Sequence, residues 1–176
     1  MSKPRVATVW LDGCSGCHMS LLDLDERLLD IFARADLVYG PLEDVKEFPE
    51  NVDVVLVEGA VSSEEDLHRI KLVRERSKIL IAFGDCAVTS NVPGMRNPIG
   101  VAPLLARAYL ENVDINPMIP NRVVPMLLPT SQPVNRFVDV DVFLPGCPPS
   151  ADLIYGMLDD LLSGKTPDVA GARCGR

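Results

Sequence analysis

The stretch NVDVVLVEGAVSSEEDLHRIKLVRERSKILIAFGDC, residues 51–86, decides the fold. It begins with an apolar, β-branched run at residues 51–61, which is typical of a strand buried on both faces. Ser62 and Glu65 then form a capping-box pattern, which predicts a helix that continues to about Arg76. A second apolar run follows at residues 77–86 and ends in a glycine loop. This order predicts two parallel strands joined by a right-handed crossover helix.

The same alternation extends from this unit in both directions. Residues 5–11 predict a strand, and the turn residues Gly13 and Gly16 follow it directly. An amphipathic pattern from about His18 to Phe32 predicts a helix, and residues 35–40 predict a weak second strand. The stretch DVDVFLPGCPPSADLIYGMLDDLL, residues 139–162, predicts a last strand, a loop and a helix capped by Ser150. We therefore predict one flavodoxin-like α/β domain over residues 1–176, with a doubly wound parallel sheet.

Two segments fall outside this alternation. Residues 91–132 are dense in proline and predict an insertion that is mostly loop, with one helix near residues 102–111. Long loops of this kind often form interfaces or sites. Residues 164–176 are polar and contain glycine, which predicts a flexible tail or a segment that lies on a partner.

Charge and composition narrow the class of protein. The 176 residues carry a formal net charge of −8, which argues against nucleic acid or an anionic membrane as the partner. We find no signal-peptide pattern and no apolar run of transmembrane length, so we expect a cytoplasmic protein. In a reducing compartment the five cysteines are better explained by metal binding or catalysis than by disulfides.

Four cysteines share one structural context, because each comes directly after a predicted strand. Cys14 and Cys17 follow the first strand, Cys86 follows the fourth, and Cys147 follows the last. The carboxyl ends of parallel strands meet at one edge of the sheet, so these thiols can converge there. Four thiolates are the ligands of a [4Fe-4S] cluster, and a C-x-x-C loop can place two of them at adjacent corners. The helix after Cys17 would offer free N–H groups to the anionic cluster.

Two alternatives to a cluster are open on cysteine spacing alone. A structural zinc ion would use the same ligands, although zinc sites usually come as two close pairs and only one pair here is close. A thioredoxin-like redox pair would fit a lone C-x-x-C motif, but two further cysteines reach the same sheet edge. The cysteine pattern favours a cluster over zinc.

Whole segments carry a family resemblance. VWLDGCSGCHMSLLDLDE, VLVEGAV, AFGDCAVTSNVPGMRNPIG and LPGCPPSADLI resemble, in order, the motifs of nickel-iron hydrogenase small subunits, especially those of the soluble, NAD(P)-reducing, bidirectional enzymes. The resemblance implies that Cys14, Cys17, Cys86 and Cys147 hold the cluster nearest to a nickel-iron site. It places that site in a separate large subunit, so that this chain conducts electrons and is not catalytic on its own.

The resemblance also implies further partners. Electrons would pass from this cluster to flavin and iron-sulfur subunits that reduce NAD(P). Enzymes of this family are associated with a flavin near the small subunit, which makes FMN a second candidate cofactor, although no nucleotide fingerprint is present. The related subunit of respiratory complex I, a quinone oxidoreductase, has two adjacent cysteines where this chain has C-x-x-C, so the hydrogenase assignment is preferred. A zinc-stapled interaction module is the remaining alternative.

Single residues near the motifs receive separate predictions. Glu58, at a strand end, either hydrogen-bonds near the cluster or the large subunit, or it reaches solvent. His18 is a candidate neighbour of the cluster, and His68 is expected on a solvated helix face. Trp10 is expected to pack in the core. Cys174 matches no cluster ligand.

Overall fold

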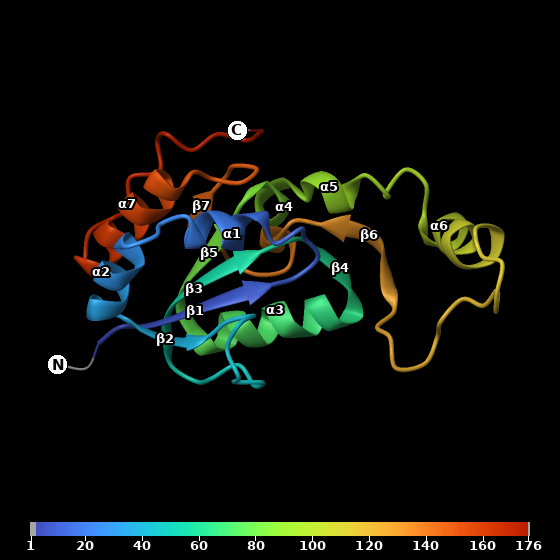
Figure 1. Ribbon diagram of the computed structural model, residues 1–176, viewed down its shortest axis with the longest axis horizontal. Helices are drawn as coiled ribbons and strands as arrows, with labels where there is room; N and C mark the ends of the chain where they lie inside the picture. Colours follow the sequence, from blue (N-terminus) through green and yellow to red (C-terminus); the bar gives the residue numbers. More distant parts are fainter. Residues whose placement is uncertain (1–2, 176) are drawn as a thin grey trace.

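The computed structural model describes residues 3–175 and contains a five-stranded parallel sheet (Figure 1). The sheet order is β2-β1-β3-β5-β7, which is the order of a flavodoxin-like fold when its strands are counted along the chain. The predicted fold class is therefore confirmed. The strands are β1 (Arg5–Trp10), β2 (Asp36–Tyr39), β3 (Val52–Glu58), β5 (Ser77–Phe83) and β7 (Val142–Leu144).

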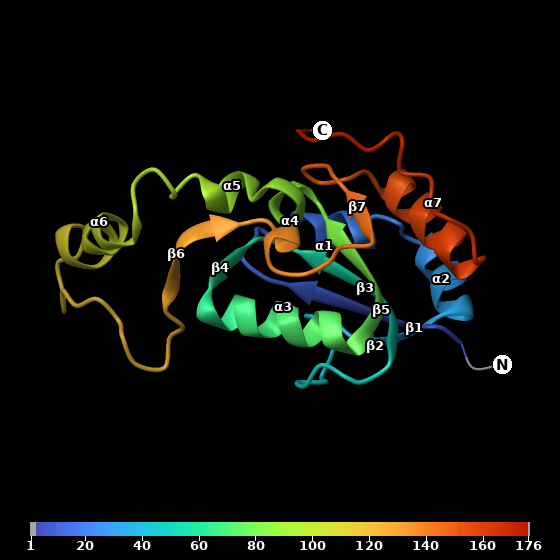
Figure 2. The same ribbon diagram turned by 180° about the vertical axis from the view of Figure 1, so that it is seen from behind.

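Helices cover both faces of this sheet (Figures 1 and 2). One face packs against α3 (Glu64–Arg76), and the other packs against α1 (Gly16–Leu22), α2 (Arg27–Arg34) and α7 (Ala151–Leu162). Each face of the sheet has its own apolar core. Alternate residues of β3 pack into the one or the other, because successive strand side chains point to opposite faces. Val55 and Val57 belong to the α3 core, whereas Val54 and Leu56 belong to the α7 core.

The helix predicted for residues 18–32 is interrupted. Helix α1 ends at Leu22, α2 begins at Arg27, and Asp25 between them has φ 51°. An α-helix cannot continue through a left-handed residue, and Asp tolerates that conformation better than most. The break lets Leu24, which is 1% exposed, enter the core between the two helices.

The strand predicted for residues 51–61 is also divided. Strand β3 ends at Glu58, Gly59 turns the chain with φ 94°, and β4 (Val61–Ser63) pairs antiparallel with β6 (Leu127–Gln132). The capping box consequently lies one residue later than predicted. Ser63 Oγ accepts from Asp66 N (3.1 Å), and Asp66 Oδ2 accepts from Ser63 N (2.9 Å).

The proline-rich insertion has more structure than the sequence predicted. Its helix is confirmed as α6 (Val101–Ala106), which continues as a π-helical turn to Glu111. The insertion also contains α5 (Asn91–Gly94) and β6, and this strand was missed because it pairs with a segment far away in the sequence. The single-domain boundary and the flexible tail stay predictions, and residues 1, 2 and 176 of those ranges lie outside the described chain.

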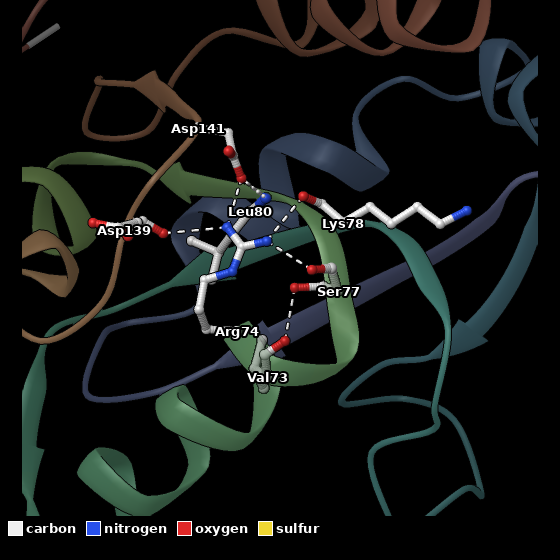
Figure 3. A network of polar contacts seen from close by, with 7 residues as sticks. All are labelled: Val73, Arg74, Ser77, Lys78, Leu80, Asp139 and Asp141. Carbon is white, nitrogen blue, oxygen red and sulfur yellow. Dashed lines mark hydrogen bonds and ion pairs between the residues drawn. The ribbon is translucent and has the colours of Figure 1, made fainter.

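Arg74 joins three elements at the end of the sheet opposite the cysteines (Figure 3). Its guanidinium donates to Asp141 Oδ2 (2.6 Å), Ser77 O (2.6 Å) and Lys78 O (2.9 Å). Asp141 Oδ2 also accepts from Leu80 N (2.7 Å). Burial raises the pKa of Asp141, but the Leu80 N–H and Arg74 outweigh it, so this pKa is lowered. These hydrogen bonds around Arg74 and Asp141 link the end of α3 to the starts of β5 and β7.

We expect Arg74→Met to lower the free energy of unfolding by about 1–2 kcal/mol, because several carbonyl and carboxylate oxygens lose their donor. The ion pair stabilises the protein above the unfolded pKa of Asp141. It is lost as the pH falls through the lower folded pKa, so the difference between wild type and variant should shrink in acid. Urea denaturation at pH 7 and pH 3 measures both effects. Arg69→Met, which removes an exposed pair with Glu65 on the same helix, is the control and should change little.

Candidate functional site

The four cysteines lie in the segments that leave the carboxyl edge of the sheet. Cys14 and Cys17 follow β1, Cys86 lies in α4 (Asp85–Thr89) directly after β5, and Cys147 follows β7. Cys17 is buried, Cys86 is half-buried, Cys14 and Cys147 are exposed, and all four are free thiols. Strands β1 and β3 are neighbours at the point where the strand order reverses, which is where ligands bind in such sheets.

Cys17 and Cys86 lie near enough to the other cysteines to interact with them electrostatically. Burial raises the pKa of the Cys17 thiol well above its usual range, and the charges of Glu58, Cys86, Cys14 and Cys147 raise it further. Burial likewise raises the pKa of Cys86, with Cys14 and Cys147 contributing, against an opposing hydrogen bond from Val92 N–H. Both shifts favour the protonated thiols of Cys17 and Cys86 in the chain without metal, and a metal group would have to replace those two protons.

Backbone hydrogen bonds hold the loop after β5 against the loop after β7. Gly84 N donates to Leu144 O (2.8 Å), and Asp85 N donates to Gly146 O (2.8 Å). Gly146 N donates in return to Asp85 Oδ1 (2.6 Å). These bonds fix the relative positions of two loops that are 61 residues apart in the sequence.

The loop after β1 meets these loops at Gly84. A Cβ atom at Gly84 would overlap with Cys17 Sγ, and the backbone there has φ 84°. Only glycine fits both conditions without strain. The missing side chain therefore makes the space in which Cys17 Sγ lies.

Glu58 belongs to this site and does not reach solvent. It is 2% exposed, and its carboxylate accepts from Cys17 N (3.3 Å) and His18 N (2.9 Å). It also pairs with His18 Nδ1. The solvent alternative is therefore wrong. The expectation of free N–H groups at the start of α1 is corrected for two of them, because Cys17 N and His18 N donate to this carboxylate.

The remaining predicted residues have mixed outcomes. His68 is exposed, as predicted. Trp10 is 44% exposed and donates through Nε1 to Gly13 O (3.0 Å), so the prediction of core packing is wrong. It lines an apolar cavity of about 300 Å³ between β1, β2 and the α1–α2 segment. The cavity lining also includes His18, whose Nε2 is buried without a partner in residues 3–175.

The described residues were compared with the arrangement that a single metal ion requires. No three His, Cys, Asp or Glu side chains there lie close enough together to share one metal ion. A zinc ion needs its ligands around one point, whereas a [4Fe-4S] cube takes one thiolate at each of four separated irons.

No helix within residues 3–175 is long and apolar enough to cross a membrane.

Comparisons with known proteins identify the family of the chain. Residues 14–161 match the family described as NADH ubiquinone oxidoreductase, 20 Kd subunit. The chain is 40% identical to the NAD-reducing hydrogenase HoxS subunit delta of Cupriavidus necator over 95% of this chain and 82% of that protein. It is 41% identical to a subunit of the F420-non-reducing hydrogenase vhu of Methanocaldococcus jannaschii over 93% of this chain. It spans only 57% of that relative's length.

A solved hydrogenase structure also resembles this chain. One chain of the NAD+-reducing [NiFe]-hydrogenase, in the H2-reduced state, is 38% identical and superposes with a TM-score of 0.92 over 95% of both chains. The fold and the site thus define a flavodoxin-like protein with four thiols on the loops beside its switch point. The chain belongs to the NADH ubiquinone oxidoreductase 20 kDa subunit family and, within it, to the hydrogenase small subunits.

Proposed function

We propose that this chain is the electron-transferring small subunit of a nickel-iron hydrogenase. It holds one [4Fe-4S] cluster on Cys14, Cys17, Cys86 and Cys147. It relays electrons between the nickel-iron site of a large subunit and flavin and iron-sulfur subunits that reduce NAD(P). The observation that carries the proposal is the presence of four free thiols on the three segments that follow β1, β5 and β7 at one sheet edge. Hydrogenase relatives support it.

The site fits such a cluster by its donors and by its space. When bound, the cluster would supply one-electron transfer. The chain supplies thiolates of soft character, which iron-sulfur clusters require. Gly84 keeps a side chain out of the space beside Cys17 Sγ, and Glu58 fixes the first turn of α1, on which Cys17 lies.

The insertion is the proposed contact surface for the large subunit. It extends away from the sheet in Figure 1 and is anchored by Asn97, which exchanges hydrogen bonds with Ser131 backbone atoms (2.7 and 2.8 Å). An arm rich in exposed apolar side chains indicates a protein interface. The exposed apolar residues of this arm are Val92, Met95, Ile99, Tyr109, Leu110, Ile115, Met118, Val123, Val124 and Met126.

We do not extend the proposal to FMN. The cavity beside Trp10 has an apolar lining, but among residues 3–175 no Lys or Arg side chain lines it, whereas Glu43 does. Its lining therefore offers no cation to the phosphate of FMN.

The cytoplasmic location is part of the proposal, and cell fractionation would test it.

The proposed function is tested with the purified chain after iron and sulfide reconstitution. It should show the absorbance and the reduced-state paramagnetic resonance of one [4Fe-4S] cluster, but it should neither consume nor evolve hydrogen. Hydrogen cleavage needs a metal with open coordination positions, and a cluster saturated by four thiolates has none. Adding the large subunit should restore hydrogen-dependent dye reduction.

Two results would contradict the relay. One is hydrogen uptake by this chain alone. The other is full hydrogen-dependent NAD(P) reduction by a complex in which this chain lacks its cluster. A zinc-stapled module would instead contain zinc and no iron or sulfide.

Cluster removal should also loosen the site locally. We expect backbone amide exchange at residues 13–19 and 83–87 to rise on iron loss, because the loops then lose their shared anchor. Exchange in the buried centre of β3 should stay slow and serves as the internal control. Equal protection with and without iron at the two loops would count against a cluster bound there.

A further inference from the structure

Asp85, which lies between Gly84 and Cys86 in the sequence, has a buried carboxylate. The residue is 3% exposed, and both of its carboxylate oxygens accept backbone hydrogen bonds. Oδ1 accepts from Gly146 N (2.6 Å), and Oδ2 accepts from Gly175 N (2.6 Å). A buried carboxylate depends on its donors, because an unpaired buried charge is costly.

The two donors come from different parts of the chain. Gly146 directly precedes Cys147, whereas Gly175 lies in the segment after α7, 90 residues from Asp85. Figures 1 and 2 both show this segment returning from α7 to the cysteine end of the sheet. Asp85 therefore connects the tail to the loop that presents Cys147.

The fifth cysteine lies at the same contact. Burial, followed by the charge and a side-chain hydrogen bond of Asp85, raises the pKa of the Cys174 thiol. The thiol thus stays protonated beside the carboxylate, where it is a donor and a poor metal ligand. This gives Cys174 a place in the structure that its sequence position did not indicate.

We propose that Asp85 is a positioning residue that clamps residues 174–175 against the loop of Cys147, and that this clamp keeps Cys86 and Cys147 in place for the cluster. The inference rests on the proposed function for its cluster. The clamp itself is a property of the chain without metal. It predicts that a change in the tail alters Gly146, to which none of residues 164–175 makes a direct hydrogen bond.

Two variants open the clamp from opposite sides. Asp85→Asn removes the charge and one acceptor oxygen. Gly175→Pro leaves Asp85 unchanged and removes the tail N–H donor, together with the positive φ (76°) that Gly175 adopts at the clamp. In the metal-free full chain, each should raise amide exchange at Gly146 and alkylation of Cys147 by roughly 10-fold. In the reconstituted chain, each should speed cluster loss to a chelator by a similar factor. The double variant should lose the cluster no faster than the worse single variant.

Conservative changes separate positioning from a general loss of stability. Cys174→Ser retains an O–H donor for Asp85 and should keep the wild-type half-life of the cluster, whereas Cys174→Ala should shorten it. The reduced-cluster resonance spectrum should change alike in Asp85→Asn and Gly175→Pro. Asp168→Asn is the control, since it makes the same charge change in the tail and its side chain bonds only Ala170 N (3.0 Å) among the described residues.

The outcomes are distinguishable. Unchanged Gly146 exchange in Gly175→Pro, or fully additive effects in the double variant, would overturn the clamp. If Asp85→Asn does not fold, Gly175→Pro and Cys174→Ala still decide it, because both lie in the exposed tail. A chain that binds no cluster in any variant would contradict the proposed function, while the exchange data would still judge the clamp.

Discussion

Replacing any one of Cys14, Cys17, Cys86 and Cys147 by serine is expected to remove the [4Fe-4S] cluster or convert it to a smaller one. A serine oxygen is a poor substitute for a soft thiolate, and each cysteine is proposed to hold a different iron of the cube. Cluster content per chain should fall several-fold or more, from one toward zero. Iron and acid-labile sulfide analysis, together with visible absorbance, measures the loss.

Cys174→Ser is the matched control for this series. It makes the same chemical change at the one cysteine outside the proposed ligand set, so it should keep the full iron and sulfide content. If the content fell only in the Cys174 variant, the ligand assignment would be wrong. If the Cys147→Ser chain kept its cluster, Cys147 alone would be excluded as a ligand.

Gly84→Ala should have the largest effect among substitutions that leave the ligands intact. Its Cβ would overlap with Cys17 Sγ, and φ 84° disfavours any L-residue with a side chain. Backbone strain and displacement of the thiol together should lower the free energy of unfolding by about 3 kcal/mol or more. The displaced thiol should also prevent cluster reconstitution. Urea denaturation and iron analysis test the two effects separately.

Gly156→Ala is the control for the glycine variant. Gly156 lies within α7, and a Cβ there meets nothing within 4 Å. Because alanine has the higher helix propensity, this variant should be as stable as wild type or up to about 1 kcal/mol more stable. A Gly84→Ala chain with normal stability and a normal cluster would show that Cys17 Sγ does not occupy the position described.

Local pattern in the sequence determined the main architecture. Apolar runs such as residues 52–58 are buried strands, and the amphipathic and capping signals between them gave α3 and α7. A strand that ends in a loop carries its next residues to the carboxyl edge, whatever the rest of the chain does. The position of the four cysteines at one end of the sheet therefore followed from the sequence alone.

Contacts between distant segments decided the rest. Strand β6 exists because it pairs with β4, and that pairing extends the backbone through Ser63 and moves the helix cap by one residue. No local signal marks such a partner. Trp10 was expected in the core by its type, but it lies on the rim of a cavity that opens where α1 and α2 separate.

The roles of Glu58 and Asp85 show the same division. The sequence placed Glu58 at a strand end near the cysteines, but it could not choose between solvent and a buried partner. For Asp85, beside Cys86, it indicated no role. Glu58 accepts hydrogen bonds from residues 40 and 41 positions away, and Asp85 from residues 61 and 90 positions away. Sequence patterns report the period and propensity of one segment. The partner of a buried charge depends on which loops the finished sheet brings together, so only the tertiary structure decided it.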